Sequence, residues 1–166
     1  MTERTLLLMR HAKSDYPTGV TDHERPLAPR GVREAGLAGD WLRASAPPID
    51  LVLCSTAVRT RETLALTKLT APVTFTDRLY DAVPSTVIDE INGVDDDVTT
   101  LLVIGHEPAM SSVALGLAET STDENDAAES ISTKFPTSAI ARLRTGSRWR
   151  GLGFGGAELV SFHVPR

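Results

Sequence analysis

The sequence has one cysteine and no long apolar run, and each shortage argues against a class of protein. A lone Cys54 cannot form a disulfide within the chain, which fits a reducing compartment. No apolar run approaches the ~20 residues that span a bilayer. The apolar stretch at residues 6–9 is also too short for a signal peptide. We therefore expect a cytoplasmic protein that makes no membrane contact.

Positive charge is also scarce, with 17 Lys and Arg against 22 Asp and Glu and a formal net charge of −5. No cluster of basic residues stands out, so we expect no nucleic-acid partner. The sequence contains neither a His-Glu-x-x-His run nor a Cys/His cluster, so we expect no metal site and no cofactor. A site for one small anion needs only a few local cations, and an acidic chain can supply those.

The pattern of apolar residues predicts one α/β domain over residues 1–166. Short apolar runs, typical of buried strands, alternate with segments of helical spacing, which favours a three-layer α/β/α sandwich with a mostly parallel central sheet. The period changes to two near the C-terminus, where two strands are joined by the glycine-rich residues 146–156 and either pair with each other or extend the sheet. The earlier strands are expected at residues 5–9, 51–54, 73–75 and 101–104, and the helices at residues 31–44, 58–69, 84–91 and 108–118.

Residues 119–134 are polar and acidic and show no strong period. A segment of this kind is either a surface loop or a flap over a site. We favour the surface loop.

Candidate functional residues follow the predicted strands. Arg10 and His11 come directly after the first strand, where ligand sites of open α/β sheets lie. Taken alone, His11 is more typical of a hydrogen-bonded loop histidine. His106 follows another apolar strand, and Arg59 lies in the first turn of the helix after the second strand. Because parallel strands end at one edge of a sheet, the sequence predicts a small cationic pocket there, suited to phosphate oxygens. The alternative for Arg59 is a surface ion pair with Glu62.

These residues resemble the motifs of a known family. The run Leu-Met-Arg-His-Ala-Lys-Ser at residues 8–14 is similar to the Arg-His-Gly motif of the histidine phosphatase superfamily, also called the phosphoglycerate mutase-like superfamily. Residues 55–63 resemble its second motif, and Gly105-His106 resembles its third. Ala12 departs from the family pattern, since the superfamily usually has glycine at that position.

Within the superfamily, the chain looks most like the small SixA-type phosphohistidine phosphatases. It is short, it has Arg25-Pro26-Leu27, and residues 135–140 resemble the tail motif of that subgroup. Leu27, Gly31 and Ala35 match the helix that follows the first motif. The resemblance covers nearly the whole chain and implies the phosphoglycerate mutase-like fold.

The resemblance also implies a mechanism. His11 would be the nucleophile and would carry the phosphoryl group as a phosphohistidine intermediate, without a metal ion. Arg10, Arg59 and His106 would bind the phosphoryl oxygens, and Ser14 would donate a further hydrogen bond. Attack requires a neutral His11 with one nitrogen free, and the sequence does not show which group holds the other nitrogen.

The proton donor and the substrate stay open at this level. Asp81 lies where many relatives carry an acidic donor, and it is equally well interpreted as a turn aspartate. An imidazole leaves more easily than an alkoxide, so an uncertain donor fits P–N cleavage better than P–O cleavage. The favoured function is a phosphohistidine phosphatase acting on a phosphorylated protein. The alternatives are a phosphomonoesterase acting on a small phosphorylated metabolite and a non-catalytic phosphate-binding scaffold.

Overall fold

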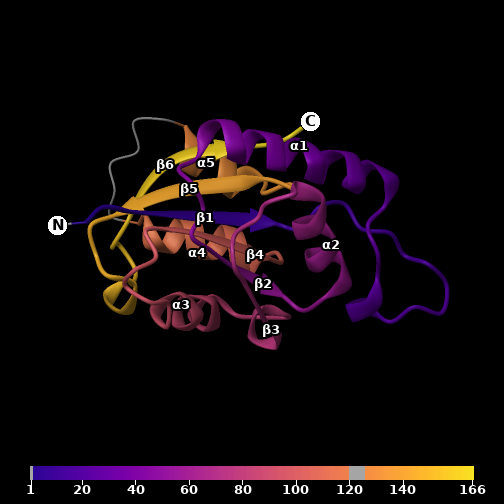
Figure 1. The fold of residues 1–166 in the computed structure, drawn as a ribbon, viewed down its shortest axis with the longest axis horizontal. Helices are drawn as coiled ribbons and strands as arrows, with labels where there is room; N and C mark the ends of the chain where they lie inside the picture. The colour runs from indigo at the N-terminus through magenta and orange to yellow at the C-terminus, as the bar shows by residue number, and fades with distance from the viewer. Residues whose placement is uncertain (1, 120–125) are drawn as a thin grey trace.

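A computed structural model describes residues 2–119 and 126–166, and these residues build a six-stranded sheet in the order β3-β2-β4-β1-β5-β6 (Figure 1). Strands β3, β2, β4 and β1 are parallel, β5 is antiparallel to β1, and β6 is antiparallel to β5. The last two strands therefore both pair with each other and extend the sheet. The strands are β1 (Arg4–Arg10), β2 (Leu51–Ser55), β3 (Val73–Thr76), β4 (Thr100–Gly105), β5 (Ile140–Thr145) and β6 (Glu158–His163).

Helices cover both faces of the sheet, because successive side chains of a buried strand point to opposite sides. Leu7 and Met9 of β1 share one apolar cluster with residues of α1 (Pro29–Ser45) and α2 (Val58–Thr67). Leu6 and Leu8 share another with residues of α3 (Pro84–Asn92), α4 (Ala109–Leu117) and α5 (Ala127–Thr133). The predicted three-layer α/β/α sandwich is confirmed. Short 3-10 helices occupy Asp22–Glu24 (η1), Asp77–Leu79 (η2) and Trp149–Gly151 (η3).

Two element predictions need correction. The second helix ends at Thr67 rather than at residue 69, because Lys68 adopts a left-handed conformation with φ of 58°. The surface loop expected over residues 119–134 contains helix α5. Ala127 and Ile131 lie four residues apart, which places both on one helical face, and both are buried against the core. Residues 120–125 of that segment lie outside the described residues.

The helices of the described residues include none that is both long enough and apolar enough to cross a membrane.

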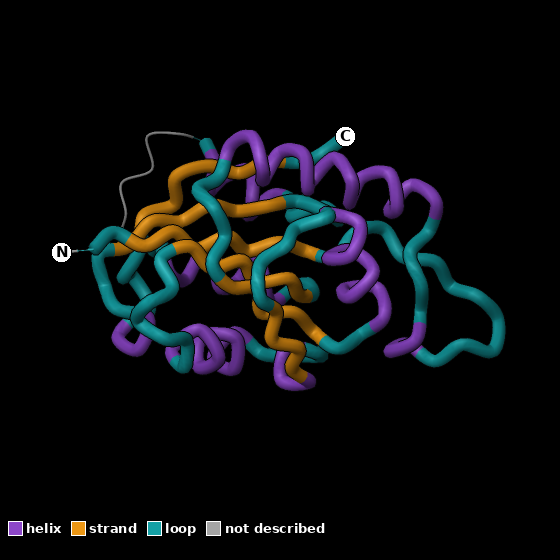
Figure 2. Tube along the Cα trace, viewed as in Figure 1, coloured by secondary structure: helices purple, strands orange, loops and turns teal. Residues whose placement is uncertain are grey.

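A long excursion between β1 and α1 extends beyond the end of the sheet (Figures 1 and 2). Its two ends are held together by an isolated antiparallel bridge between Ser14 and Leu27. The start of α1 approaches the same place, where a Cβ added to Gly31 would lie 2.1 Å from the carbonyl oxygen of Lys13. Only glycine fits this contact. The chain that follows β1 is therefore fixed close to the strand's carboxyl end.

Candidate functional site

The register of β1 and β4 brings two histidines together. Arg10 lies opposite Gly105 in this parallel pair, and the backbone N–H of His11 donates to the carbonyl of Gly105 at 3.0 Å. The next residues, His11 and His106, therefore leave the sheet side by side, with ring centroids 5.2 Å apart. Gly105 is the last residue of β4, and a Cβ there would lie 2.9 Å from Met110 Cε.

The predicted site residues other than Asp81 line one cavity of about 210 Å³. Two cations that the sequence reasoning did not assign to the site, Lys13 and Arg25, line it as well, and Glu107 is an acidic member of its wall. The excess of positive charge suits an anion. The predicted residues in the wall are Arg10, His11, Ser14, Arg59 and His106.

The ring of His11 is neutral, and one of its nitrogens is free. Its Nδ1 lies 2.7 Å from the carbonyl oxygen of Ala12, and since a carbonyl can only accept, Nδ1 carries the proton and Nε2 keeps its lone pair. Burial, with smaller contributions from His106, Arg59 and Arg10, lowers the pKa of His11 to about 3. The group that holds the second nitrogen, which the sequence left open, is thus the backbone of the following residue.

His106 is held by a residue of the second motif. Its Nε2 lies 2.9 Å from Ser55 Oγ, and that oxygen already accepts from the N–H of Ala57. With the hydroxyl donating to Nε2, the proton of the neutral ring sits on Nδ1, which is buried and has no hydrogen-bond partner among the described residues. Burial and the nearby Arg59 lower the pKa of His106 to about 4. This N–H can donate to an oxyanion in the cavity.

The acidic and hydroxyl residues of the second motif hold the loop after β1. Thr63 Oγ1 accepts from the N–H of Ala12 at 2.9 Å and donates to the carbonyl of Arg59 at 2.7 Å. Glu62 accepts from the N–H of Leu27 at 2.8 Å. The alternative of an Arg59–Glu62 surface pair is therefore wrong, because Glu62 is engaged by the backbone of the excursion and Arg59 is buried.

Both arginines of the predicted site are anchored by hydrogen bonds from their terminal nitrogens, and the Nε–H of each is left for another acceptor. Arg10 Nη1 donates to the carbonyl of Phe135 at 2.9 Å. Arg59 Nη1 donates to the carbonyl of Asp22 at 2.7 Å, and its Nη2 donates to the Asp22 carboxylate at 3.2 Å. The Nε atom of each arginine is buried without a partner in the described part of the chain. A buried unpaired N–H is costly, and a bound anion would satisfy it.

The excursion after β1 supplies functional residues that the sequence reasoning missed. Arg25 Nη2 donates to Ser14 Oγ at 3.1 Å, and its guanidinium lies 4.0 Å from the ring centroid of Tyr16. The Ser14–Leu27 bridge places Arg25 there. The sequence did offer a signal for Arg25, because the run Arg25-Pro26-Leu27 is part of the resemblance to the SixA-type proteins.

Asp22, at the start of η1, connects several of these groups. Its carboxylate accepts from the Tyr80 hydroxyl and from Arg59, and it lies 3.3 Å from Arg25 Nε. The hydrogen bond from Tyr80, with smaller contributions from Arg59 and Arg25, lowers the pKa of Asp22. No sequence pattern pointed to this residue, because its partners come from three separate segments.

Asp81 lies beside the cationic cavity rather than in it. It lines a second cavity of about 240 Å³ together with Asp22 and Tyr80, and this cavity shares Arg59 and His106 with the first. Asp81 is exposed and has φ of 54°, a conformation that aspartate and asparagine adopt more readily than most residues. Its assignment as a proton donor stays a prediction.

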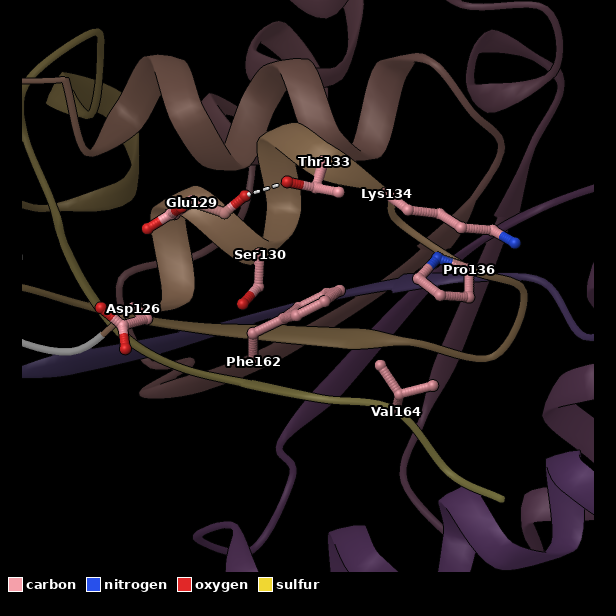
Figure 3. Close-up of a pocket in the computed structure, with 8 residues that line it drawn as sticks. All are labelled: Asp126, Glu129, Ser130, Thr133, Lys134, Pro136, Phe162 and Val164. Atoms are coloured by element: carbon pink, nitrogen blue, oxygen red, sulfur yellow. Dashed lines mark hydrogen bonds between the residues drawn. The ribbon is translucent and has the colours of Figure 1, made fainter.

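A larger hollow of about 620 Å³ lies away from these residues, with α5 as one wall and Phe162 and Val164 on the other side (Figure 3). Lys134 is the cation in its described lining, and neither His11 nor His106 contributes to it. Size alone therefore does not identify the candidate site. In the described part of the chain, no three His, Cys, Asp or Glu side chains are grouped as metal ligands.

The neutral state of His11 can be checked by NMR. We expect the imidazole resonances of His11 to stay unchanged between about pH 5 and pH 8, and those of the urea-unfolded chain to titrate near 6.5. Because the pKa is lower in the folded state, the unfolded chain binds more protons as the pH falls. Stability should therefore decline below about pH 6.5. A midpoint near 6.5 for His11 in the folded protein would contradict the assignment.

Comparison with known proteins identifies the family. The model of the histidine phosphatase superfamily (branch 1) matches residues 6–82. Uncharacterized protein Rv1276c of Mycobacterium tuberculosis is 61% identical over 158 residues, which cover 95% of this chain and 100% of that protein. Uncharacterized protein ML1117 of Mycobacterium leprae is 59% identical over 162 residues, with coverage of 95% and 100%.

Solved structures agree with this result. The structure of a protein assigned as phosphohistidine phosphatase SixA from Nakamurella multipartitia superposes on this chain with a TM-score of 0.91 at 38% identity, over 99% of this chain and 98% of that chain. The protein histidine phosphatase SixA complexed with tungstate shares the fold, with a TM-score of 0.78 at 23% identity over 97% of each chain. The chain belongs to the histidine phosphatase superfamily. Within it the chain is of the SixA type, it has the phosphoglycerate mutase-like fold, and this membership supports phosphatase activity.

Proposed function

We propose that residues 1–166 act as one catalytic domain that hydrolyses phosphohistidine in a phosphorylated protein, with His11 as the nucleophile. The observation that carries the proposal is the Nδ1–H bond from His11 to the Ala12 carbonyl, which leaves Nε2 unprotonated in a cationic cavity. Such a nitrogen is ready to attack phosphorus at neutral pH.

The reaction would proceed in two displacements. First, His11 Nε2 forms a bond to phosphorus while the bond from phosphorus to the leaving group breaks, and the electron pair goes to the leaving atom. Water then attacks the phosphohistidine on His11, which releases inorganic phosphate and restores the neutral imidazole. Splitting the reaction in this way replaces one difficult step with two easier ones.

The remaining predicted residues would stabilise the transferring group. The unpaired Nε–H groups of Arg10 and Arg59 and the Nδ1–H of His106 are donors for its equatorial oxygens. Ser14, buried and held by Arg25, would donate one more hydrogen bond. These donors are fixed before substrate binds, because Phe135, Asp22 and Ser55 already hold the side chains that carry them.

The substrate class is supported by two observations. The similar protein from Nakamurella is assigned as a phosphohistidine phosphatase. The acidic residue in the expected donor position, Asp81, is exposed and lines the second cavity rather than the one that holds His11. A weakly placed acid suffices for an imidazole leaving group. Hydrolysis of a small phosphate ester is the second candidate, and the presence of Asp81 beside His106 is what favours it.

The function is tested by comparing kcat/KM for a phosphohistidine-bearing protein with kcat/KM for a panel of sugar phosphates and nucleotides. We expect the phosphoprotein to be preferred. A clear preference for one metabolite would replace the proposal with the small-molecule alternative, and no hydrolysis of any compound would favour a scaffold.

We also propose that the reaction needs no metal ion. The rate of p-nitrophenyl phosphate hydrolysis should then be the same before and after treatment with a chelator. Strong inhibition that added metal reverses would contradict this part of the proposal.

If Asp81 is the proton donor, Asp81→Asn should slow hydrolysis of an alkyl phosphate about 100-fold, because an alkoxide needs a proton as it leaves. Asparagine tolerates the left-handed backbone at this position, so the fold should be retained. Hydrolysis of phosphohistidine by the same variant provides the comparison and should fall far less, because an imidazole that is protonated on its remote nitrogen needs no proton donor to leave. Equal losses on both substrates would show that Asp81 has another role.

A further inference from the structure

The second cavity differs from the first in charge. It is bounded by the carboxylates of Asp22, Asp81 and Glu107, and the cation in its described lining is Arg59. The Asp22 carboxylate accepts from Arg59 Nη2 at 3.2 Å, so these two charges largely offset each other, and Asp81 and Glu107 carry the excess negative charge. The cavity that holds His11 has four Arg and Lys side chains against Glu107. A cationic compartment and an acidic compartment therefore lie next to each other.

The two compartments adjoin each other. Arg59, His106 and Glu107 line both of them. His106 is only 8% exposed, and its Nδ1 has no hydrogen-bond partner among the described residues. Because the compartments adjoin at these residues, a molecule that places its phosphoryl group beside His11 and His106 can extend its remaining part into the acidic compartment.

The acidic compartment also has an aromatic wall. The Tyr80 ring meets the His106 ring edge-to-face, with centroids 5.6 Å apart, and the Tyr80 hydroxyl donates to Asp22. The hydrogen bond to Asp22 raises the pKa of this hydroxyl, so the phenol stays neutral at physiological pH. His23 also packs on the Tyr80 ring, with centroids 4.8 Å apart, and the Arg59 guanidinium lies 5.9 Å from its centroid, so the carboxylates rather than the ring favour a group that carries positive charge or N–H donors.

We propose that this compartment is the leaving-group subsite, and that Asp81 and Glu107 make the enzyme prefer cationic or N–H-bearing leaving groups over anionic ones. The inference rests on the proposed function and extends it to a charge preference. Metabolites that carry a carboxylate or a second phosphate beside the scissile phosphate would be disfavoured, since like charges repel.

The preference has a chemical consequence for phosphohistidine. When the substrate imidazole is protonated on the nitrogen remote from phosphorus, breaking the P–N bond returns the electron pair to the bonded nitrogen and releases a neutral imidazole. No proton donor is then required for departure. Carboxylates that accept a hydrogen bond from the remote N–H would stabilise this protonated form and so promote cleavage.

The test uses two aryl phosphates of nearly equal shape, with a para trimethylammonium group or a para tert-butyl group. The quantity measured is the ratio of kcat/KM for the cationic compound to kcat/KM for the neutral one. Asp81→Asn should lower this ratio about threefold, as expected for loss of one partly screened charge contact. Added salt should lower the wild-type ratio in the same direction.

Asp97→Asn is the matched control, because it removes one exposed carboxylate just ahead of β4, at the opposite end of that strand from His106. It should leave the ratio unchanged. A ratio that rises in Asp81→Asn would overturn the inference in favour of proton donation, because loss of an acid harms the poorer leaving group, tert-butylphenol, more. An unchanged ratio would also overturn it, while leaving phosphatase activity established. If neither compound were hydrolysed, the result would contradict the proposed function as well as the inference that rests on it.

Discussion

Replacing His11 by asparagine should lower kcat by at least about 10³-fold, because the variant has no nitrogen that can form the covalent intermediate. Asparagine retains a polar side chain of similar length, so the cavity should keep its shape. His11 lies between β1 and the Ser14–Leu27 bridge, and its own N–H bond to Gly105 involves only the backbone. The loss should therefore appear in turnover rather than in folding.

The measurement is the initial rate of p-nitrophenyl phosphate hydrolysis, with thermal unfolding to confirm that the variant is folded. His163→Asn is the control, since His163 lies on the edge strand β6 and stacks on Trp41 at 4.5 Å, outside the cavity. A rapid-quench experiment should trap an acid-labile phosphoryl group on wild type and none on His11→Asn. Turnover that survives the substitution would rule out His11 as nucleophile.

The sheet and its edge were predictable from sequence because they depend on local patterns. Continuous apolar runs mark buried parallel strands, and such strands end together. Arg10, His11 and His106 follow two of these runs directly, so their meeting required only that β1 and β4 be neighbours. Because Arg10 pairs with Gly105, the residues that follow the two strands, His11 and His106, are adjacent.

Residues of the long excursion were not predictable in the same way. Asp22 reaches Arg59 and Tyr80 only because the Ser14–Leu27 bridge folds the excursion back, and no apolar period encodes that bridge. Helix α5 was missed for a related reason. Its apolar face amounts to Ala127 and Ile131 within a polar segment, and packing against α4 and β6 supplies the rest of its stability.

The orientation of Arg59 predicts the second large effect, a loss of about 100-fold in kcat/KM for Arg59→Lys. Asp22 occupies Nη1 and Nη2 of this guanidinium, which leaves the buried Nε–H for the substrate. A lysine ammonium is a single point charge and cannot hold two positions at Asp22 while donating in a third direction. Retaining the charge should therefore not retain the activity.

Arg61→Lys is a closely matched control, because it makes the same chemical change two residues along the same helix, at an exposed position. Its kcat/KM should stay within about twofold of wild type, since substitutions of exposed residues away from a site have small effects. Inhibition by orthovanadate should weaken in Arg59→Lys in proportion to the loss of kcat/KM, because both report binding of the transferring group in its transition-state geometry. If Arg59→Lys instead kept its kcat/KM within about twofold of wild type, as Arg61→Lys should, the contribution of Arg59 would be its positive charge alone, and the fixed geometry set by Asp22 would have no part in catalysis.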